Sequence, residues 1–277
     1  MAVSFCPAGV VWRDSRLTAA ILDRVPSLHS NRGAKRAREA RDALGLPLDR
    51  APEDLLEAVE ARGGAHVVAL DLGDGVAGAH LARPGCPLLF VNGRQPPTRQ
   101  RFTLAHEFGH HRLGHATVVD RPQAFSDSHD PLEVEANAFA AELLIPRAAM
   151  ERWADEREPG PITLEDVVRL AAEYGVSAQM ARIRLETTRA LTDRGRADRL
   201  DAEIGAREHV ALAEYLGLTA PRDRLAAGPL PRIPAPLRAG PIGRLLAGEL
   251  DADGLAAQLG LDPAAVRRML ANLGLVA

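Results

Sequence analysis

Residues 101–115 read RFTLAHEFGHHRLGH and hold four of the nine histidines in this 277-residue chain. Within this stretch, His106, Glu107 and His110 form the pattern H-E-x-x-H. Residues four apart lie on one face of a helix, so both imidazoles can reach a single ion. Zinc binds imidazole well, and a catalytic zinc takes three protein ligands and leaves one position for water. The spacing therefore predicts a zinc site, with Glu107 as the catalytic residue that accepts a proton.

A solvated helix that is rich in histidine by chance, or a structural histidine pair, is the alternative to this site. The face that carries the pair also carries Phe102, Ala105, Gly109 and Leu113. These residues are apolar or small, so the face is expected to be buried. A buried helix that directly follows short strands favours the metal site.

His111 and His115 are also four residues apart, but Arg112 occupies the position where a second H-E-x-x-H would need glutamate. Their helical positions face away from the first pair, so we interpret them as surface or helix-end residues. The metzincin pattern is excluded, because Leu113 and Ala116 stand where it needs a glycine and a third histidine.

The third metal ligand must come from outside this helix. The candidates are Asp127, His129, Asp130, Glu133, Glu135 and Glu142. Glu133 is best placed, because Asn137 follows on the same helix face and could hydrogen-bond the site. Glu135 points about 200° away from Glu133 at 100° per residue. The competing role for Glu133 is that of a capping residue three positions after Asp130, and one side chain cannot fill both roles.

Three short apolar runs precede the histidine-rich helix and predict strands: HVVALDL (66–72), GVAGAHLA (75–82) and PLLFVN (87–92). The tripeptide GDG joins the first two, which predicts a hairpin within a small antiparallel sheet. A sheet edge can pair with an extended peptide, so Phe90, Val91 and Asn92 are candidate substrate-binding residues.

The rest of the chain is expected to be mostly helical. Helices are predicted in 34–44, 51–64, 98–114 and 130–146, with a helix-turn-helix in 164–190 and a polar loop over 117–130. Six prolines between Pro221 and Pro241 predict a stiff linker.

After the linker, residues 242–277 are expected to form a small helical module that governs partner choice rather than chemistry. Its segment LAAQLGLDPAAVRRMLANLGLV (255–276) is typical of a helix-turn-helix. Three arginines against four acidic residues give this module a net charge of 3 − 4 = −1, which argues against strong DNA binding. A chain ending near Leu218 is therefore expected to keep its metal and its activity.

The net charge of −3 gives no electrostatic drive toward nucleic acid or a membrane surface. The two cysteines, Cys6 and Cys86, fit neither a disulfide framework nor a CxxC metal site. No signal-like segment and no apolar run of membrane-spanning length is found. We therefore expect a reduced, cytoplasmic protein without membrane association.

Two motifs in order carry a family resemblance: QRFTLAHEFGHHRLGH (100–115) and EVEANAFAAELLIP (133–146). Together they resemble the ImmA/IrrE family of zinc metallopeptidases. LLFVNGRQPPTRQ (88–100) is similar to the strand and loop before that family's active-site helix, and VSAQMARIRLE (176–186) to its C-terminal helical piece.

The resemblance implies a zincin-like fold, one zinc ion per chain and endopeptidase activity. It places the ligands at His106, His110 and Glu133, and the catalytic acid/base at Glu107. The family's glutamate stands four residues before the asparagine of the second motif, which again selects Glu133. The resemblance also implies a protein substrate: a helix-turn-helix repressor of the XRE type, often encoded alongside, in a stress, mobile-element or toxin-antitoxin-like switch.

The expected fold is therefore α+β and mostly helical, with a zincin-like peptidase core, a small antiparallel sheet and later helix-turn-helix-like segments. The expected divisions are an N-terminal extension (1–32), the peptidase core (33–160), a helical extension (161–218), the linker (219–241) and the C-terminal module (242–277). A regulatory protein that binds DNA or a partner, with a structural or vestigial metal site, is the alternative. Glu107 discriminates between them, because a structural site has no use for a carboxylate beside an open metal position.

Overall fold

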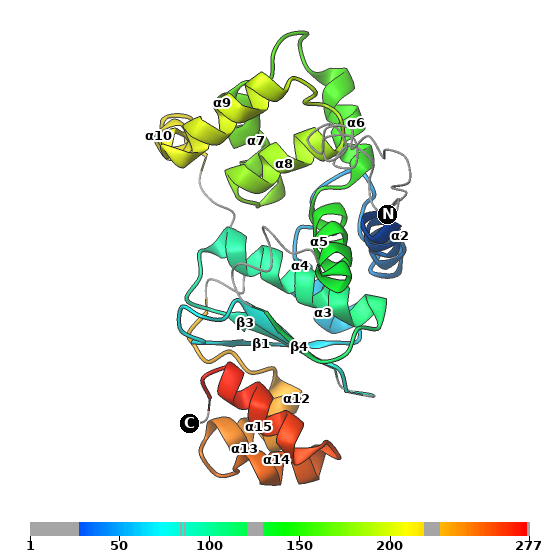
Figure 1. The fold of residues 1–277 in the computed structure, drawn as a ribbon, viewed down its shortest axis with the longest axis vertical. Helices are drawn as coiled ribbons and strands as arrows, with labels where there is room; N and C mark the ends of the chain where they lie inside the picture. The colour runs from blue at the N-terminus through cyan, green and yellow to red at the C-terminus, as the bar shows by residue number, and fades with distance from the viewer. Residues whose placement is uncertain (1–27, 84, 86, 121–129, 219–227, 276–277) are drawn as a thin grey trace, which may run out of the picture.

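The computed structural model describes residues 28–83, 85, 87–120, 130–218 and 228–275. A helical bundle, a four-stranded sheet and a small C-terminal group of helices are stacked along the long axis (Figure 1). The fold is α+β and mostly helical, as predicted. The helices are α2 (Leu28–Ala43), α3 (Leu55–Arg62), α4 (Pro97–Leu113), α5 (Pro131–Leu144), α6 (Arg147–Glu156), α7 (Leu164–Tyr174), α8 (Ala178–Thr187), α9 (Arg194–Gly205), α10 (Glu208–Tyr215), α12 (Ala235–Arg238), α13 (Pro241–Leu246), α14 (Ala252–Leu259) and α15 (Pro263–Asn272).

The sheet has the strand order β1-β3-β2-β4 and is mixed rather than antiparallel. The strands are β1 (His66–Leu70), β2 (Gly78–Leu81), β3 (Leu88–Asn92) and β4 (Val118–Asp120). Strand β3 lies between β1 and β2, parallel to the first and antiparallel to the second. The predicted hairpin of the first two strands is therefore wrong. Strand β4, which pairs with β2, lies within the segment that was expected to be a polar loop.

Asn92 explains why β1 and β2 do not pair directly. Its side-chain amide donates hydrogen bonds to the carbonyl oxygens of Gly73 and Val76, at 2.6 and 2.7 Å. These bonds hold the β1–β2 connection across the end of β3, so β2 continues on the far side of that strand. The polar side chain of Asn92 therefore stabilises a turn and does not face a substrate.

The other two substrate-binding candidates are also contradicted by the sheet order. Phe90 and Val91 lie on the central strand β3, where both edges are paired and both side chains are buried. An extended peptide can be added only to a strand with a free edge. The apolar run of residues 87–92 does not reveal this, because the sequence of a central strand and that of an edge strand can be equally apolar.

The two faces of the sheet contribute to two separate cores, because alternate side chains of a strand point to opposite faces. Val67 and Val91 pack in the cluster that includes Leu104 and Phe108 of α4. Helix α4 lies across this face with α5 beyond it (Figure 1). The opposite face, which includes Phe90, packs against the C-terminal helices α12 to α15.

Helix α2 is longer than predicted and packs closely on α5. A Cβ at Gly33 would lie 2.1 Å from the backbone oxygen of Glu135, so only glycine permits this approach. The helix spans Leu28–Ala43 and so starts before the predicted Ala34, and His29 and Arg32 near its start contact Glu135 of α5. The predicted pair of helices in 164–190 is present as α7 and α8, which are joined at Gly175 with a left-handed φ of 67°.

Residues 228–241, the described part of the predicted proline-rich linker, are packed against the sheet. Arg232 and Ala69 exchange two backbone hydrogen bonds of 2.9 and 3.0 Å, which covers the outer edge of β1. The Arg232 guanidinium also lies 2.6 Å from Glu60 Oε2 on α3. This segment and the helices that follow it are thus part of the same packed unit as the sheet.

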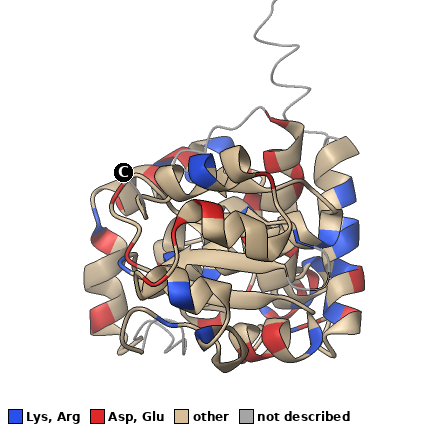
Figure 2. Ribbon diagram, turned by 90° about the horizontal axis from the view of Figure 1, so that it is seen from below, with Lys and Arg blue, Asp and Glu red and all other residues tan. Residues whose placement is uncertain are grey.

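Acidic and basic residues are interspersed over the C-terminal end of the molecule and do not gather into one basic face (Figure 2). Within the described residues, no helix combines the length and apolar character that crossing a membrane requires.

Candidate metal centre

Helix α4 carries the H-E-x-x-H residues in the middle of the protein. It begins at Pro97, whose missing N–H costs nothing in the first turn, and ends at Gly114 with a left-handed φ of 74°. Because α4 lies between the sheet and α5, most of its central residues are buried, including His106, Glu107 and His110. The predicted buried stripe is present, and both imidazoles lie on it.

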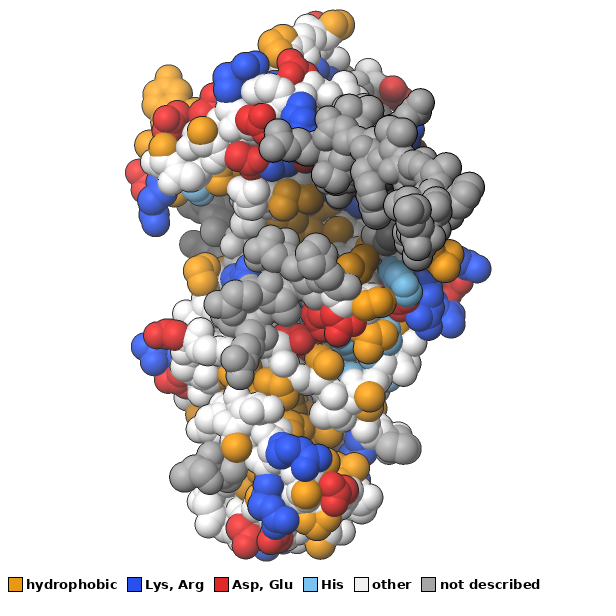
Figure 3. Space-filling view, in the orientation of Figure 1, with side chains coloured by type: hydrophobic (Ala, Val, Ile, Leu, Met, Phe, Trp, Pro, Cys, Tyr) orange, Lys and Arg blue, Asp and Glu red, His pale blue; other side chains and the backbone are white. Residues whose placement is uncertain are grey.

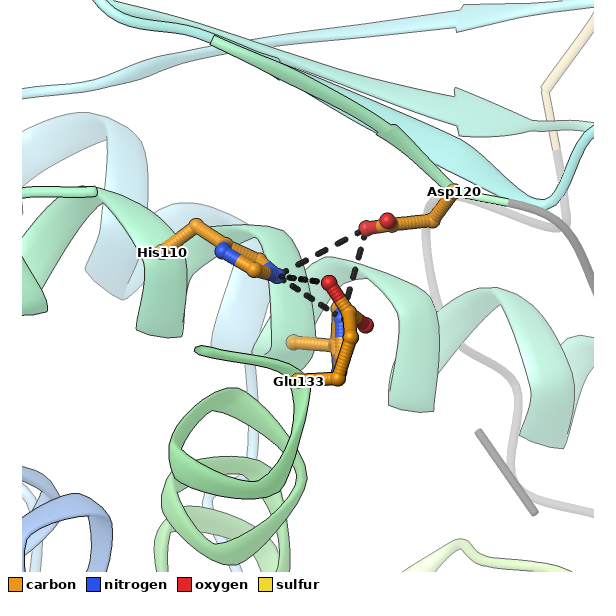
Figure 4. A group of neighbouring side chains, drawn as sticks. His110, Asp120 and Glu133 are labelled. Carbon is orange, nitrogen blue, oxygen red and sulfur yellow. Dashed lines mark hydrogen bonds and ion pairs between the residues drawn. The ribbon is translucent and has the colours of Figure 1, made fainter. Parts of the chain in front are cut away.

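Four side chains converge from three elements: His106, His110, Asp120 and Glu133. Figure 4 shows how His110, Asp120 and Glu133 point toward one another. The Nε2 atoms of His106 and His110 are 3.0 Å apart. Glu133 places Oε2 3.3 Å from the first of these nitrogens and Oε1 3.5 Å from the second. Asp120 Oδ2 lies 3.3 Å from the first and 3.7 Å from the second.

These separations of 3.0–3.7 Å are close to those around a single tetrahedral ion. Zinc–ligand distances of about 2.0–2.2 Å place neighbouring ligand atoms of a tetrahedron roughly 3.3–3.6 Å apart. The donor types, two imidazoles and two carboxylates, are also those that zinc binds. The residues present therefore fit the metal that the sequence predicts.

The cap of α5 explains why the Glu133 side chain is available to this cluster. Asp130 accepts a hydrogen bond of 2.9 Å from the backbone N–H of Leu132 and so caps the helix itself. The Glu133 carboxylate oxygens lie 3.3 and 3.5 Å from the imidazole nitrogens of His106 and His110. Asn137 lies one turn further along α5 and is partly buried, and its hydrogen bond to the site stays a prediction.

Of the remaining ligand candidates, Glu135 and Glu142 do not join the cluster. Glu135 lies 2.6 Å from Arg32 and 2.8 Å from His29, both on α2. Glu142 forms a buried ion pair with Arg184 of α8. Two further candidates, Asp127 and His129, lie outside the described residues.

Asp120 is a member of the cluster that the sequence reasoning missed. It ends β4, where the register pairs it with Gly78 of β2. The only local signal is the β-branched run Thr117, Val118 and Val119 before it, which is typical of a strand. Three residues are too few for the alternation of a strand to stand out in a polar segment.

His115 corrects a second prediction. It follows the end of α4, as expected, but it is buried and does not face away from the site. The left-handed residue Gly114 turns the chain back, so His115 Nδ1 lies 2.8 Å from His110 Nδ1. Its other nitrogen lies 3.2 Å from Glu135 Oε2. This arrangement lets the Nδ1–H of His110 donate to His115, which leaves Nε2 of His110 for a metal.

Burial controls the electrostatics of the site. It raises the pKa of the Glu107 carboxyl well above its usual value, and the neighbouring Asp120 raises it further. It lowers the pKa of His110 to about 2, with His106 contributing. Burial would lower the pKa of His106 too, but Asp120 and Glu133 outweigh it and raise that pKa. A neutral His110 is the form that binds a metal.

Gly78 makes room for Glu107. A Cβ at this position would lie 2.5 Å from Glu107 Oε1 and 2.5 Å from Thr103 Cγ2. The small residue Gly78 in β2 therefore permits the Glu107 carboxylate to lie against the sheet beside the cluster.

On the space-filling surface, acidic and histidine side chains gather at mid-height of the face shown (Figure 3).

We expect Gly78→Ala to lower the free energy of unfolding by about 1–3 kcal/mol, because the added methyl group overpacks the space beside Glu107. Gly75→Ala is the matched control, since a Cβ there meets nothing within 4 Å. Its effect should stay within roughly 0.5 kcal/mol. Urea unfolding of both variants measures this difference, and equal stabilities would show that Glu107 does not need the space.

Part of the chain is similar to known metallopeptidases. Residues 61–186 match a peptidase family described as the IrrE N-terminal-like domain. The chain is also 30% identical, over 103 residues, to the radiation response metalloprotease IrrE of Deinococcus radiodurans. That alignment covers 34% of this chain and 30% of the relative, so the chain spans about a third of the relative's length.

Proposed function

Because residues 61–186 belong to the ImmA/IrrE family of metallopeptidases, we propose that this chain is a zinc-dependent endopeptidase. The observation that carries the proposal is the convergence of His106, His110 and Glu133 on one point. Glu107, which is not one of the converging groups, is buried beside them. One zinc ion per chain is the stoichiometry that this donor set supports.

Each residue of the site has a distinct role in this proposal. His106, His110 and Glu133 hold the zinc, which when bound polarises a carbonyl and lowers the pKa of water. Glu107 accepts the proton of the attacking water and passes it to the leaving amine. The burial that raises the pKa of Glu107 suits this role, because an acid/base group works best when its pKa lies near the operating pH.

Strand β4 is the sheet edge that suits an extended substrate. The other edge, that of β1, is paired with Arg232. Strand β4 pairs with β2 and ends at Asp120, inside the metal cluster. A peptide that adds to β4 would therefore bring its backbone beside Glu107 and the imidazoles. The target must offer a flexible segment, because a packed helix or strand cannot take this extended path.

The proposed substrate is a helix-turn-helix repressor of the XRE type that is encoded alongside, and its cleavage would release repressed genes in a stress, mobile-element or toxin-antitoxin-like switch. This part of the proposal rests on the family resemblance, and we propose that the cleavage takes place in the cytoplasm. The net charge of −3 supports a protein partner rather than DNA bound by the chain itself.

The alternative function, a regulatory protein with a structural metal site, has one observation in its favour. Four protein side chains converge here, and four protein ligands are typical of structural zinc sites. The buried carboxylate of Glu107 still favours the peptidase, because a structural site would not retain an acidic side chain at the cost of its burial.

Metal content and cleavage of the co-encoded repressor, measured on the same samples, test the proposal. The full-length chain should carry one zinc and cleave the repressor, and chelation should abolish cleavage until zinc is restored. His106→Ala should lose both properties. His111→Ala, on the same helix but outside the cluster, is the matched control and should keep both. Full zinc content in His106→Ala, or cleavage that survives chelation, would refute the proposed site.

A further inference from the structure

The carboxylate of Asp120 has the position of a metal ligand and not that of a group that only orients a ligand histidine through a hydrogen bond. We propose that Asp120 is a fourth protein ligand, which closes the zinc site at rest and holds the peptidase latent until it is displaced. This inference rests on the proposed function, and it adds a regulatory step to the same site.

The atoms that Asp120 approaches distinguish a ligand from a supporting group. A carboxylate that orients a ligand histidine binds the ring nitrogen remote from the metal. In His110 that remote nitrogen, Nδ1, already faces His115 at 2.8 Å. Asp120 Oδ2 instead lies 3.3 and 3.7 Å from the Nε2 atoms of His106 and His110, the same atoms that face Glu133.

Burial and charge lead to the same conclusion. Asp120 is only 3% exposed, and its Oδ2 has no hydrogen bond of good geometry among the described residues. In that part of the chain, its ion-pair contacts are with His106 and His110 alone, while the Glu133 carboxylate lies close by and the Glu107 carboxyl lies within hydrogen-bonding reach of it. A buried carboxylate needs a positive partner or a metal, and the described residues of this site offer Asp120 two imidazoles but no lysine or arginine.

The backbone holds Asp120 at this place without help from its side chain. Its carbonyl oxygen accepts a 2.8 Å hydrogen bond from the N–H of Ala77, and β4 pairs with β2 up to this residue. A zinc with four protein ligands has no position for water, whereas a catalytic zinc keeps one open. Cleavage therefore requires the Asp120 carboxylate to leave the ion, which a peptide that pairs along β4 is placed to bring about.

Cobalt-loaded full-length protein provides a test that does not depend on cleavage. The visible spectrum of Co²⁺ reports its ligands, and azide is a small probe that binds only to an open position. Wild type, Asp120→Asn and Asp120→Ala are titrated with azide. Asp71→Asn, the same change at a carboxylate that is 57% exposed, is the matched control. Asp120→Asn keeps the side-chain volume in case the alanine variant does not fold.

We expect azide to change the spectrum of the Asp120 variants and to leave wild type and Asp71→Asn unchanged. The Asp120 variants should also bind the metal more weakly, by at least the roughly 10–100-fold that loss of a group supporting a metal ligand costs. Equal azide sensitivity in wild type and Asp120→Asn, or none in either, would overturn the inference while leaving the proposed peptidase intact. Failure of wild type to bind one Co²⁺ per chain would instead refute the proposed function, and the inference with it.

Discussion

Replacing Glu107 with Gln is expected to leave the zinc content at one per chain and to slow cleavage by about 10²–10⁴-fold, the usual effect of losing a general acid/base. The amide has the size of the carboxylate but cannot accept the proton of the attacking water. Stability should be unchanged or higher, because the variant no longer buries an acidic group whose pKa burial raises. Cleavage rates and metal analysis on the same preparations measure both effects.

Glu151→Gln is the matched control for this substitution, since Glu151 is exposed on α6 outside the cluster. It should cleave at the wild-type rate. A Glu107→Gln protein that does the same would rule out the proposed acid/base role. Loss of zinc from Glu107→Gln would show that Glu107 is a ligand and that the roles within the cluster have to be reassigned.

Removal of the residues after Leu218 is expected to unfold the chain or leave it aggregated, together with its metal site. This reverses the expectation from the sequence alone, in which the C-terminal module is independent. Val68, Leu70 and Phe90 of the sheet pack against this module and would be exposed to water. Each such side chain contributes about 1.5–3 kcal/mol when buried, and a domain is stable by only about 5–15 kcal/mol.

A point substitution tests the same shared core without deleting a segment. Leu255 of α14 is fully buried in the cluster that contains the sheet residues, so Leu255→Ala should cost about 2–5 kcal/mol. Leu48→Ala, at a position 53% exposed, is the control and should have little effect. If the shared core is correct, urea unfolding of Leu255→Ala shows one transition at lower urea. Two transitions, of which only one moves to lower urea in Leu255→Ala, would show that the module folds independently.

The parts of the site that follow from local geometry could be predicted from the sequence. The positions of His106 and His110 depend only on helical spacing, and that of Glu133 on the start of its own helix. Asp120 could not be found in this way, because it reaches the cluster through pairing with Gly78, some forty residues earlier in the chain. The side-chain direction of His115 could not be predicted from helical spacing, because the left-handed residue Gly114 ends the helix and turns the chain back.

The sequence predicts most strands of the sheet but not the order in which they pair. Short apolar runs indicate β1, β2 and β3, yet the order depends on long-range contacts. Asn92 holds the connection between β1 and β2, and residues after Pro229 cover one edge of the sheet. No local pattern encodes either contact. The same limit explains why a proline-rich segment was expected to be a linker when it is packed against β1.

The asymmetry of the sheet gives its strands unequal freedom to open. Strand β3 is paired on both sides, so its backbone amides can exchange with solvent only when neighbouring strands separate. Strand β4 has three residues and, among the described residues, one strand partner, so its opening breaks few bonds and costs much less free energy. Asp120 is the last residue of that strand. The carboxylate that faces both imidazoles is thus carried by the part of the sheet that fluctuates most easily, whereas the histidines lie on a helix buried within the core.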